Sequence, residues 1–162
     1  MSDDQYASRL EAEKARSTVQ LLFKAARLVN ERAIARARER TKQPLRTAQT
    51  ALFPHVNLEG TRLTDLAAKL GVTKQAAGQL VDELVALGQL ERIPDPLDAR
   101  AKLIRFSKRG KAGMLEGLAI LQEIEAELAG VIGAPALKVV HDALAKIVRH
   151  EQQLAEVGEK RK

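Results

Sequence analysis

A helix, a tight turn and a second helix are predicted by the stretch Thr64-Asp65-Leu66-Ala67-Ala68-Lys69-Leu70-Gly71-Val72-Thr73-Lys74-Gln75-Ala76-Ala77. Leu66, Ala67 and Leu70 form one apolar stripe at helical spacing. Gly71 can adopt the left-handed conformation that ends a helix without a steric penalty. Thr73 is a good N-cap for the helix that follows. So short a connection forces the two helices to cross steeply, as in a helix-turn-helix.

The second helix is predicted to have a polar start and an apolar end. Its apolar residues come late, at Leu80, Val81, Leu84 and Leu87, and Gly88 should end it. Its start carries Thr73, Lys74, Gln75 and Gln79. A helix start without large apolar side chains is suited to a groove rather than to a core. Gly78 costs about 1 kcal/mol relative to alanine inside a helix, so either another backbone approaches it closely or it is simply tolerated.

A basic hairpin is predicted after this helix. Residues 89–93 indicate a short strand, and the turn-rich run 94–98 separates it from a second strand over residues 100–106. We expect the connecting loop to carry Asp98, Arg100 and Lys102, whose alternate spacing places them on one face of an extended chain. Ser107 is a suitable N-cap for the next helix.

Together these motifs resemble the MarR family of bacterial winged helix-turn-helix regulators. The resemblance rests on residues 66–67, 70–75, 80–84, 88 and 91–92, and on the wing residues Asp95, Pro96, Asp98, Arg100, Ala101 and Lys102. It covers roughly residues 58–114 and departs from the family at Ala99, where an arginine is usual. It implies a sequence-specific transcriptional regulator, a repressor released by a small aromatic or anionic effector, and a homodimer joined by its terminal helices.

Long helices are predicted on both sides of this module. One should span residues 8–40, a second should begin near Pro44 and end at Phe53, and two more should follow the wing, the last opening at Pro135. The expected fold class is mainly α (α+β): a winged helix-turn-helix with a two-stranded wing and long terminal helices. We expect residues 1–45 and 112–162 to form a helical dimerisation lobe, and residues 46–111 to form the DNA-binding lobe.

The terminal helices carry more apolar surface than one chain of this size can easily cover. Their apolar faces comprise Val19, Leu22 and Phe23 near the start of the chain and Leu137, Val140, Leu144 and Ile147 near its end. Two protomers could pack these faces together, or one chain could bury them in an intramolecular bundle. A two-fold dimer would present two copies of the polar helix start to the half-sites of a pseudo-palindromic operator.

Composition excludes several kinds of site. The chain has no cysteine, which excludes disulfides, thiolate metal sites and thiol redox sensing, including that of the peroxide-sensing branch of the resembled family. It has no tryptophan, which argues against the urate-responsive branch. His55, His141 and His150 lack metal-ligand spacing, and neither a nucleophile elbow nor a phosphate-cradling glycine loop occurs. We therefore expect no enzyme activity, no metal and no cofactor.

Hydropathy and charge indicate where the protein acts and what it contacts. No apolar run is long enough for a membrane span, and residues 1–10 are too polar for a signal peptide, so we expect a cytosolic protein without membrane contact. The net charge is +6. Residues 63–111 hold nine Lys and Arg against six Asp and Glu, whereas residues 112–157 hold three against seven. A basic centre beside an acidic C-terminal part suits a protein that meets phosphate with one lobe.

The resulting hypothesis is that double-stranded DNA is the partner of the polar helix start. Gln75 and Gln79 can pair with adenine, and Lys74 can reach guanine or a phosphate. Thr73 both caps the helix and can contact the DNA backbone. The alternative is a winged helix that serves as a protein-interaction or scaffold module. Such a module should carry acidic or apolar residues at these positions, where this chain is basic.

The wing is predicted to contact DNA as well, and two further residues could belong to an effector site. Arg100 suits a narrow minor groove of strong negative potential, Asp98 should hold Arg100 by an ion pair, and Lys102 should contact a phosphate. Lys24 and His55 could line an effector site; alternatively, each is a surface group or a satisfied group at the edge of the core.

Overall fold

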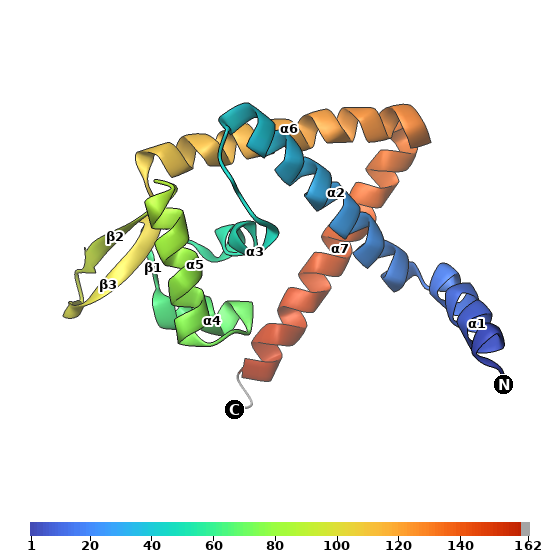
Figure 1. Cartoon of the computed structure of the whole chain (residues 1–162), viewed down its shortest axis with the longest axis horizontal. Coiled ribbons are helices and arrows are strands. Elements are labelled where there is room, and N and C mark those ends of the chain that lie inside the picture. Colours follow the sequence, from blue (N-terminus) through green and yellow to red (C-terminus); the bar gives the residue numbers. More distant parts are fainter. Residues whose placement is uncertain (160–162) are drawn as a thin grey trace. The chain divides into compact units, whose positions relative to one another are not determined.

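The computed structural model describes residues 1–159, which are mainly helical with one small antiparallel sheet (Figure 1). The helices are α1 (Asp3–Arg16), α2 (Thr18–Thr41), α3 (Thr47–Thr50), α4 (Leu63–Leu70), α5 (Lys74–Ala86), α6 (Lys108–Ile132) and α7 (Ala134–Glu159), with a 3-10 turn η1 (Phe53–His55). The strands are β1 (Thr61–Arg62), β2 (Leu90–Asp95) and β3 (Asp98–Phe106). The chain divides into two compact units after Ile120. The predicted fold class is confirmed.

The helix-turn-helix has the caps that the sequence predicts. Gly71 ends α4 with φ 65°, a left-handed conformation that suits glycine. The Thr73 hydroxyl oxygen accepts the N–H of Ala76 at 3.1 Å and so caps α5. One apolar core lies beneath both helices and the sheet; its buried members are Leu45, Leu52, Val56, Leu66, Val81, Leu84, Leu90, Ile104 and Phe106. The polar start of α5 is therefore fixed by the buried apolar residues farther along the same helix.

The sheet has three strands in the order β1-β3-β2, one more than predicted. Strand β1 pairs Thr61 with Ile104 and is only two residues long, too short to produce an alternating sequence pattern. Strand β3 begins earlier than predicted, because Asp98 already pairs with Asp95 of β2. Residues 98, 100 and 102 therefore lie on a strand, and the predicted loop that should carry them shrinks to the turn at Pro96 and Leu97.

The long N-terminal helix predicted over residues 8–40 is wrong in two respects. It begins earlier, at Asp3, where the Ser2 side chain accepts the N–H of Gln5 at 3.3 Å. It is also broken at Ser17, whose extended backbone ends α1 and whose side chain caps α2 by accepting the N–H of Gln20 at 3.3 Å. A serine inside a helical pattern can stop one helix and start another, because its hydroxyl competes for backbone hydrogen bonds.

The helix predicted between Pro44 and Phe53 is also wrong. Only the four residues of α3 are α-helical, and η1 follows separately. Arg46 has an extended backbone and its N–H is bound by the Gln49 side chain at 2.8 Å, so the helix starts after Arg46 and not at Pro44. The local hydrogen bond decides the boundary here, and the proline lies in the connecting segment.

The second compact unit contains the end of α6 and all of α7. Gly133, with φ 85°, separates the two helices, and Pro135 lies in the first turn of α7 as predicted. Along α7, Val140, Ile147 and Leu154 are exposed apolar residues. Among the residues that the structure describes, no helix combines the length and the apolar character needed to cross a bilayer.

Candidate nucleic-acid interface

The start of α5 exposes polar side chains on one side and buries an apolar side chain on another. Lys74, Gln75 and Gln79 are exposed, whereas Ala77, on another side of the same helix, is completely buried. Gln75 and Gln79 are four residues apart and therefore lie on one face of the helix. The two glutamines predicted to contact bases thus share the exposed face of α5.

The wing presents Arg100 and Lys102 from strand β3, and both side chains are exposed. The carboxylate of Asp98 accepts the backbone N–H of Arg100 at 3.0 Å. This contact differs from the predicted ion pair, in which Asp98 would bind the Arg100 guanidinium. Because a side-chain oxygen two residues before an N–H forms a local turn, Asp98 sets the backbone of the wing and leaves the guanidinium available.

Asp95 is a wing residue whose role the sequence did not predict. Its carboxylate is buried, accepts the N–H of Leu97 at 2.9 Å and binds the Nε and Nη2 atoms of Arg62, each at 2.7 Å. The N–H of Leu97, and then the Arg62 guanidinium, hold the pKa of this carboxyl below its usual range. Asp95 thus ties the turn of the wing to strand β1. A contact between residues 33 apart leaves no local sequence signal.

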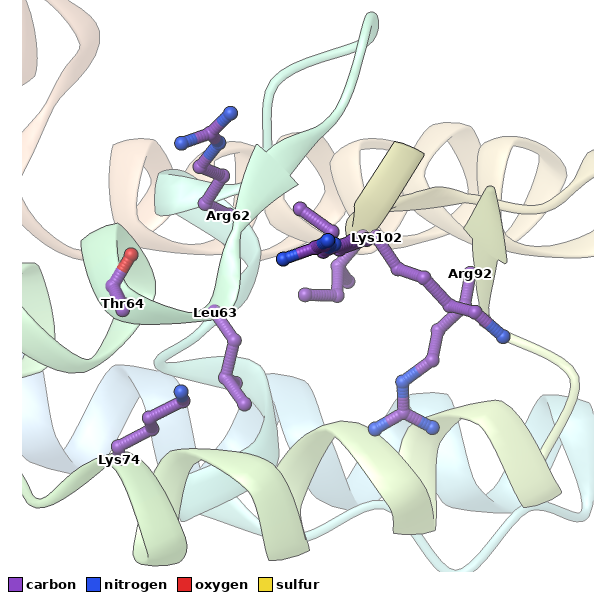
Figure 2. Close-up of a pocket in the computed structure, with 9 residues that line it drawn as sticks. Arg62, Leu63, Thr64, Lys74, Arg92 and Lys102 are labelled. Atoms are coloured by element: carbon purple, nitrogen blue, oxygen red, sulfur yellow. The ribbon is translucent and has the colours of Figure 1, made fainter. Parts of the chain in front are cut away.

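A cationic cleft of about 380 Å³ lies between the start of α5, the start of α4 and the wing (Figure 2). It is lined by Arg62, Leu63, Thr64, Lys74, Arg92, Arg100, Ala101, Lys102 and Ile104. Three of these cations, Lys74, Arg100 and Lys102, were predicted to contact DNA. Arg62 and Arg92 were not, and the fold adds them to the same cleft. In Figure 2, Arg92 extends from β2 toward α5.

Arg92 is held by an exposed partner. Its Nη1 atom lies 2.7 Å from the Asp82 carboxylate, whose side chain is 66% exposed. The Glu91-Arg92 pair is part of the family resemblance, so the resemblance could have marked Arg92 as a site residue. The spacing of residues in the sequence alone did not assign Arg92 a role. Arg62 lies outside every motif that the sequence offers.

The two residues proposed for an effector site do not share a cavity. Lys24 is exposed on α2 and lines a small cavity of about 180 Å³ with Glu11, Lys14, Ala15, Gln20 and Leu21 of α1 and α2. His55 ends η1, is half-buried, and its backbone carbonyl accepts the Thr61 hydroxyl at 3.3 Å. Within the described part of the chain, no group of three His, Cys, Asp or Glu could hold a metal ion.

Comparison with family models gives one match that coincides with this interface. Residues 55–101, from the end of η1 into strand β3, match the MarR family. This match is confined to the winged segment of the chain.

Several solved structures share the fold of this chain. A protein of Mycobacterium tuberculosis, RV1404, is 24% identical over 81% of this chain and 90% of its own, with a TM-score of 0.66. The transcriptional regulator Tm0710 of Thermotoga maritima is 22% identical over 83% and 93%, with a TM-score of 0.61. The transcriptional repressor CouR, bound to a 23-mer DNA duplex, is 20% identical over 83% and 94%, with a TM-score of 0.59. A search of curated proteins finds no match.

Proposed function

We propose that the protein is a sequence-specific, double-stranded-DNA-binding regulator of transcription. The observation that carries this proposal is the cationic cleft, where five Lys and Arg side chains from four separate segments meet beside an exposed polar helix start. Clustered cations supply the salt-dependent affinity of proteins for the DNA backbone. The family match over the same residues, and the DNA-bound repressor among the structural neighbours, support the same function.

The contacts divide into those that position the protein and those that select a sequence. Gln75 and Gln79 are suited to base edges in the major groove, where glutamine can pair with adenine. Lys74 can reach guanine or a phosphate from the same groove. Thr73, with its oxygen used as a cap, can still donate its hydroxyl hydrogen to a phosphate.

The wing would contact the minor groove that adjoins this major groove. Arg100 is suited to a narrow minor groove and Lys102 to a phosphate beside it. The positive charge of these side chains disfavours the alternative of a scaffold module, which would need an acidic or apolar surface here.

A homodimer completes the proposal. Apolar side chains remain exposed on the terminal helices: Val19 (56%) and Phe23 (64%) on α2, and Val140 (45%) and Ile147 (46%) on α7. Residues 1–45 and 112–162 would form the dimerisation lobe, and residues 46–111 the DNA-binding lobe. Two protomers related by a two-fold axis would bind the half-sites of a pseudo-palindromic operator. Repression released by a small effector, in the cytoplasm, is the mode of action that the family resemblance favours.

The test is to sequence the genomic DNA that the purified protein retains. We expect a recurring pseudo-palindrome that the protein binds more tightly than a scrambled duplex of the same composition. A variant with Lys74, Arg100 and Lys102 all changed to glutamine should lose this binding while it keeps its helical circular-dichroism spectrum. Retained fragments without a common sequence would contradict sequence-specific binding.

A further inference from the structure

The cationic cleft lies where the backbone of a bound duplex would have to pass. The major and minor grooves of DNA are separated by one sugar–phosphate strand, so a protein that places a helix in one groove and a wing in the next must accommodate that strand between them. In this protein, the space between the start of α5 and β3 is the cleft itself. Among the described residues that line it, five are cations and none carries a carboxylate.

We propose that the cleft is a seat for a DNA phosphodiester, with Arg62 and Arg92 as cationic contacts and Gly78 as the position that leaves room for it. This inference rests on the proposed function and assigns new residues to it. Sequence patterns assign neither arginine a role and leave Gly78 unexplained.

Arg62 is already held in place for such a contact. Its Nε and Nη2 atoms are bound to one oxygen of Asp95, which is itself buried and fixed by the N–H of Leu97. This arrangement leaves the Nη1 side of the guanidinium for an anion. Because a planar guanidinium that is already oriented loses little freedom on binding, Arg62 is suited to a phosphate oxygen.

Arg92 reaches the cleft through an exchangeable contact. Its partner, Asp82, is exposed, and ion pairs between exposed groups contribute little to stability because water and salt screen them. A phosphate oxygen can therefore replace the Asp82 carboxylate on Arg92. The bond to Asp82 keeps the guanidinium beside the cleft when no DNA is present.

Gly78 lies on the face of α5 that adjoins the cleft. It is four residues from Lys74, which lines the cleft, and four from Asp82, which binds Arg92, so the three positions share one helix face. A Cβ atom at Gly78 would meet only the Leu63 side chain, at 3.7 Å, and no backbone of another element within 4 Å. Close backbone approach thus does not explain this glycine. Since Leu63 lines the cleft, a longer side chain at position 78 would extend into the space of the phosphodiester.

The experiment compares the salt dependence of DNA binding among variants of the full chain. The probe is a fluorescently labelled duplex of mixed sequence, because phosphate contacts act on every sequence. Arg92→Gln removes a proposed contact. Its matched control is Arg105→Gln, which removes an arginine paired at 2.7 Å with Glu91 in the same sheet but outside the cleft. Gly78→Leu fills the space proposed for the phosphodiester.

We expect Arg92→Gln and Gly78→Leu to reduce the slope of log affinity against log salt by about 0.9 for each phosphate that the protein no longer neutralises. Arg105→Gln should keep the parental slope. If Arg92→Gln and Gly78→Leu kept the parental slope, the proposed phosphodiester site would be wrong while the proposed function stands. If the parent protein bound no duplex, the proposed function itself would be wrong.

A calorimetric titration with inorganic phosphate tests whether the cleft binds a free phosphate ion rather than a DNA phosphodiester. We expect Arg92→Gln to weaken both phosphate binding and the salt dependence of DNA binding. If Arg92→Gln abolished phosphate binding but kept the parental DNA slope, the cleft would be a small-anion site and the seat would be wrong.

Discussion

The Asp95 carboxylate connects the turn of the wing with strands β1 and β2. It holds the N–H of Leu97 in the turn and the guanidinium of Arg62 on strand β1, while its own backbone belongs to β2. On the other side of the hairpin turn, the Asp98 carboxylate likewise accepts a backbone N–H, that of Arg100. At the scale of single residues, the acidic side chains of the wing thus position its backbone and its cations.

The pH dependence of stability should reveal Asp95. Its pKa is lowered in the folded state, first by the N–H of Leu97 and then by Arg62. The resulting stabilisation is complete above the unfolded pKa of about 4 and is lost as the pH falls through the lowered folded pKa. Asp95→Asn should therefore be less stable than the parent at pH 7, with a smaller difference at pH 3.

Urea unfolding of both proteins at the two pH values measures this effect. The comparison with the parent is needed because the pKa values of Glu11 and Glu83 are also lowered and contribute to acid sensitivity in both proteins. An equal difference at pH 7 and pH 3 would show that the charge of Asp95 does not matter.

Arg100 and Asp98 should respond differently to substitution. Arg100→Ala should cost about 1–3 kcal/mol of binding free energy, the range of a good base contact, with the larger loss on A·T-rich flanks. Asp98→Ala should weaken binding less, because it loses only the backbone contact. Asp98→Asn keeps an oxygen acceptor for the Arg100 N–H and should bind nearly as well as the parent.

These affinities are measured by titrating two operators that differ only in their flanks, with thermal melts to verify the fold. If Asp98→Asn were as weak as Asp98→Ala, the charge of Asp98 would act on the Arg100 guanidinium after all. If Arg100→Ala bound both operators like the parent, the wing would not contact DNA.

At the scale of elements, the junction between α5, β2 and α6 is held together by backbone contacts. The Ser107 hydroxyl donates to the carbonyl of Gly88 at 2.6 Å and accepts the N–H of Gly110 at 2.9 Å. The N–H of Ser107 donates to the carbonyl of Gln89 at 3.0 Å. A Cβ atom at Gly110 would lie 1.9 Å from that same carbonyl oxygen, so only glycine fits.

Two glycines of α6 should therefore give opposite results. Gly110→Ala forces the backbone apart and should destabilise the fold by about 1–3 kcal/mol, as overpacking of a core does. Gly117→Ala has no atom within 4 Å of the added methyl and should stabilise the helix by about 0.5–1 kcal/mol. Chemical denaturation of both variants checks the pair, and a neutral Gly110→Ala would contradict the close contact.

The ends of the two helices in the helix-turn-helix could be predicted from the sequence. Gly71 and Thr73 determine the helix-turn-helix, because a left-handed cap and a hydroxyl cap need only neighbouring residues. Strand β1 and the role of Arg62 could not be predicted, since both depend on partners far along the chain. The break at Ser17 could not be predicted, because serine can be accommodated in a helix or can end one.

At the scale of the whole chain, the cationic cleft and the exposed apolar surface lie on different elements. The basic cleft belongs to the unit that ends at Ile120, whereas the unit after it carries exposed apolar residues along α7. This distribution suits contact with phosphate in the first unit only, whereas association with another chain would use α7 together with the exposed apolar residues of α2.

The proposed dimer should depend on the apolar face of α7. Val140→Asp combined with Ile147→Asp places two charges on side chains that are about half exposed, so the chain should fold but no longer associate. The control is His141→Asp, an exposed position next to Val140. Light scattering at micromolar concentration should give a dimer for the parent and the control and a monomer for the double variant. A monomeric parent would rule out the dimer.

The contact between Gly110 and the Gln89 carbonyl also has a thermodynamic consequence. Because no space separates these backbones, the first turn of α6 cannot rotate without displacing the start of β2, and with it the wing. A ligand that binds near α6 and favours one position of this turn would change the affinity for DNA. Since such coupling is reciprocal, bound DNA would change the affinity for that ligand by the same factor.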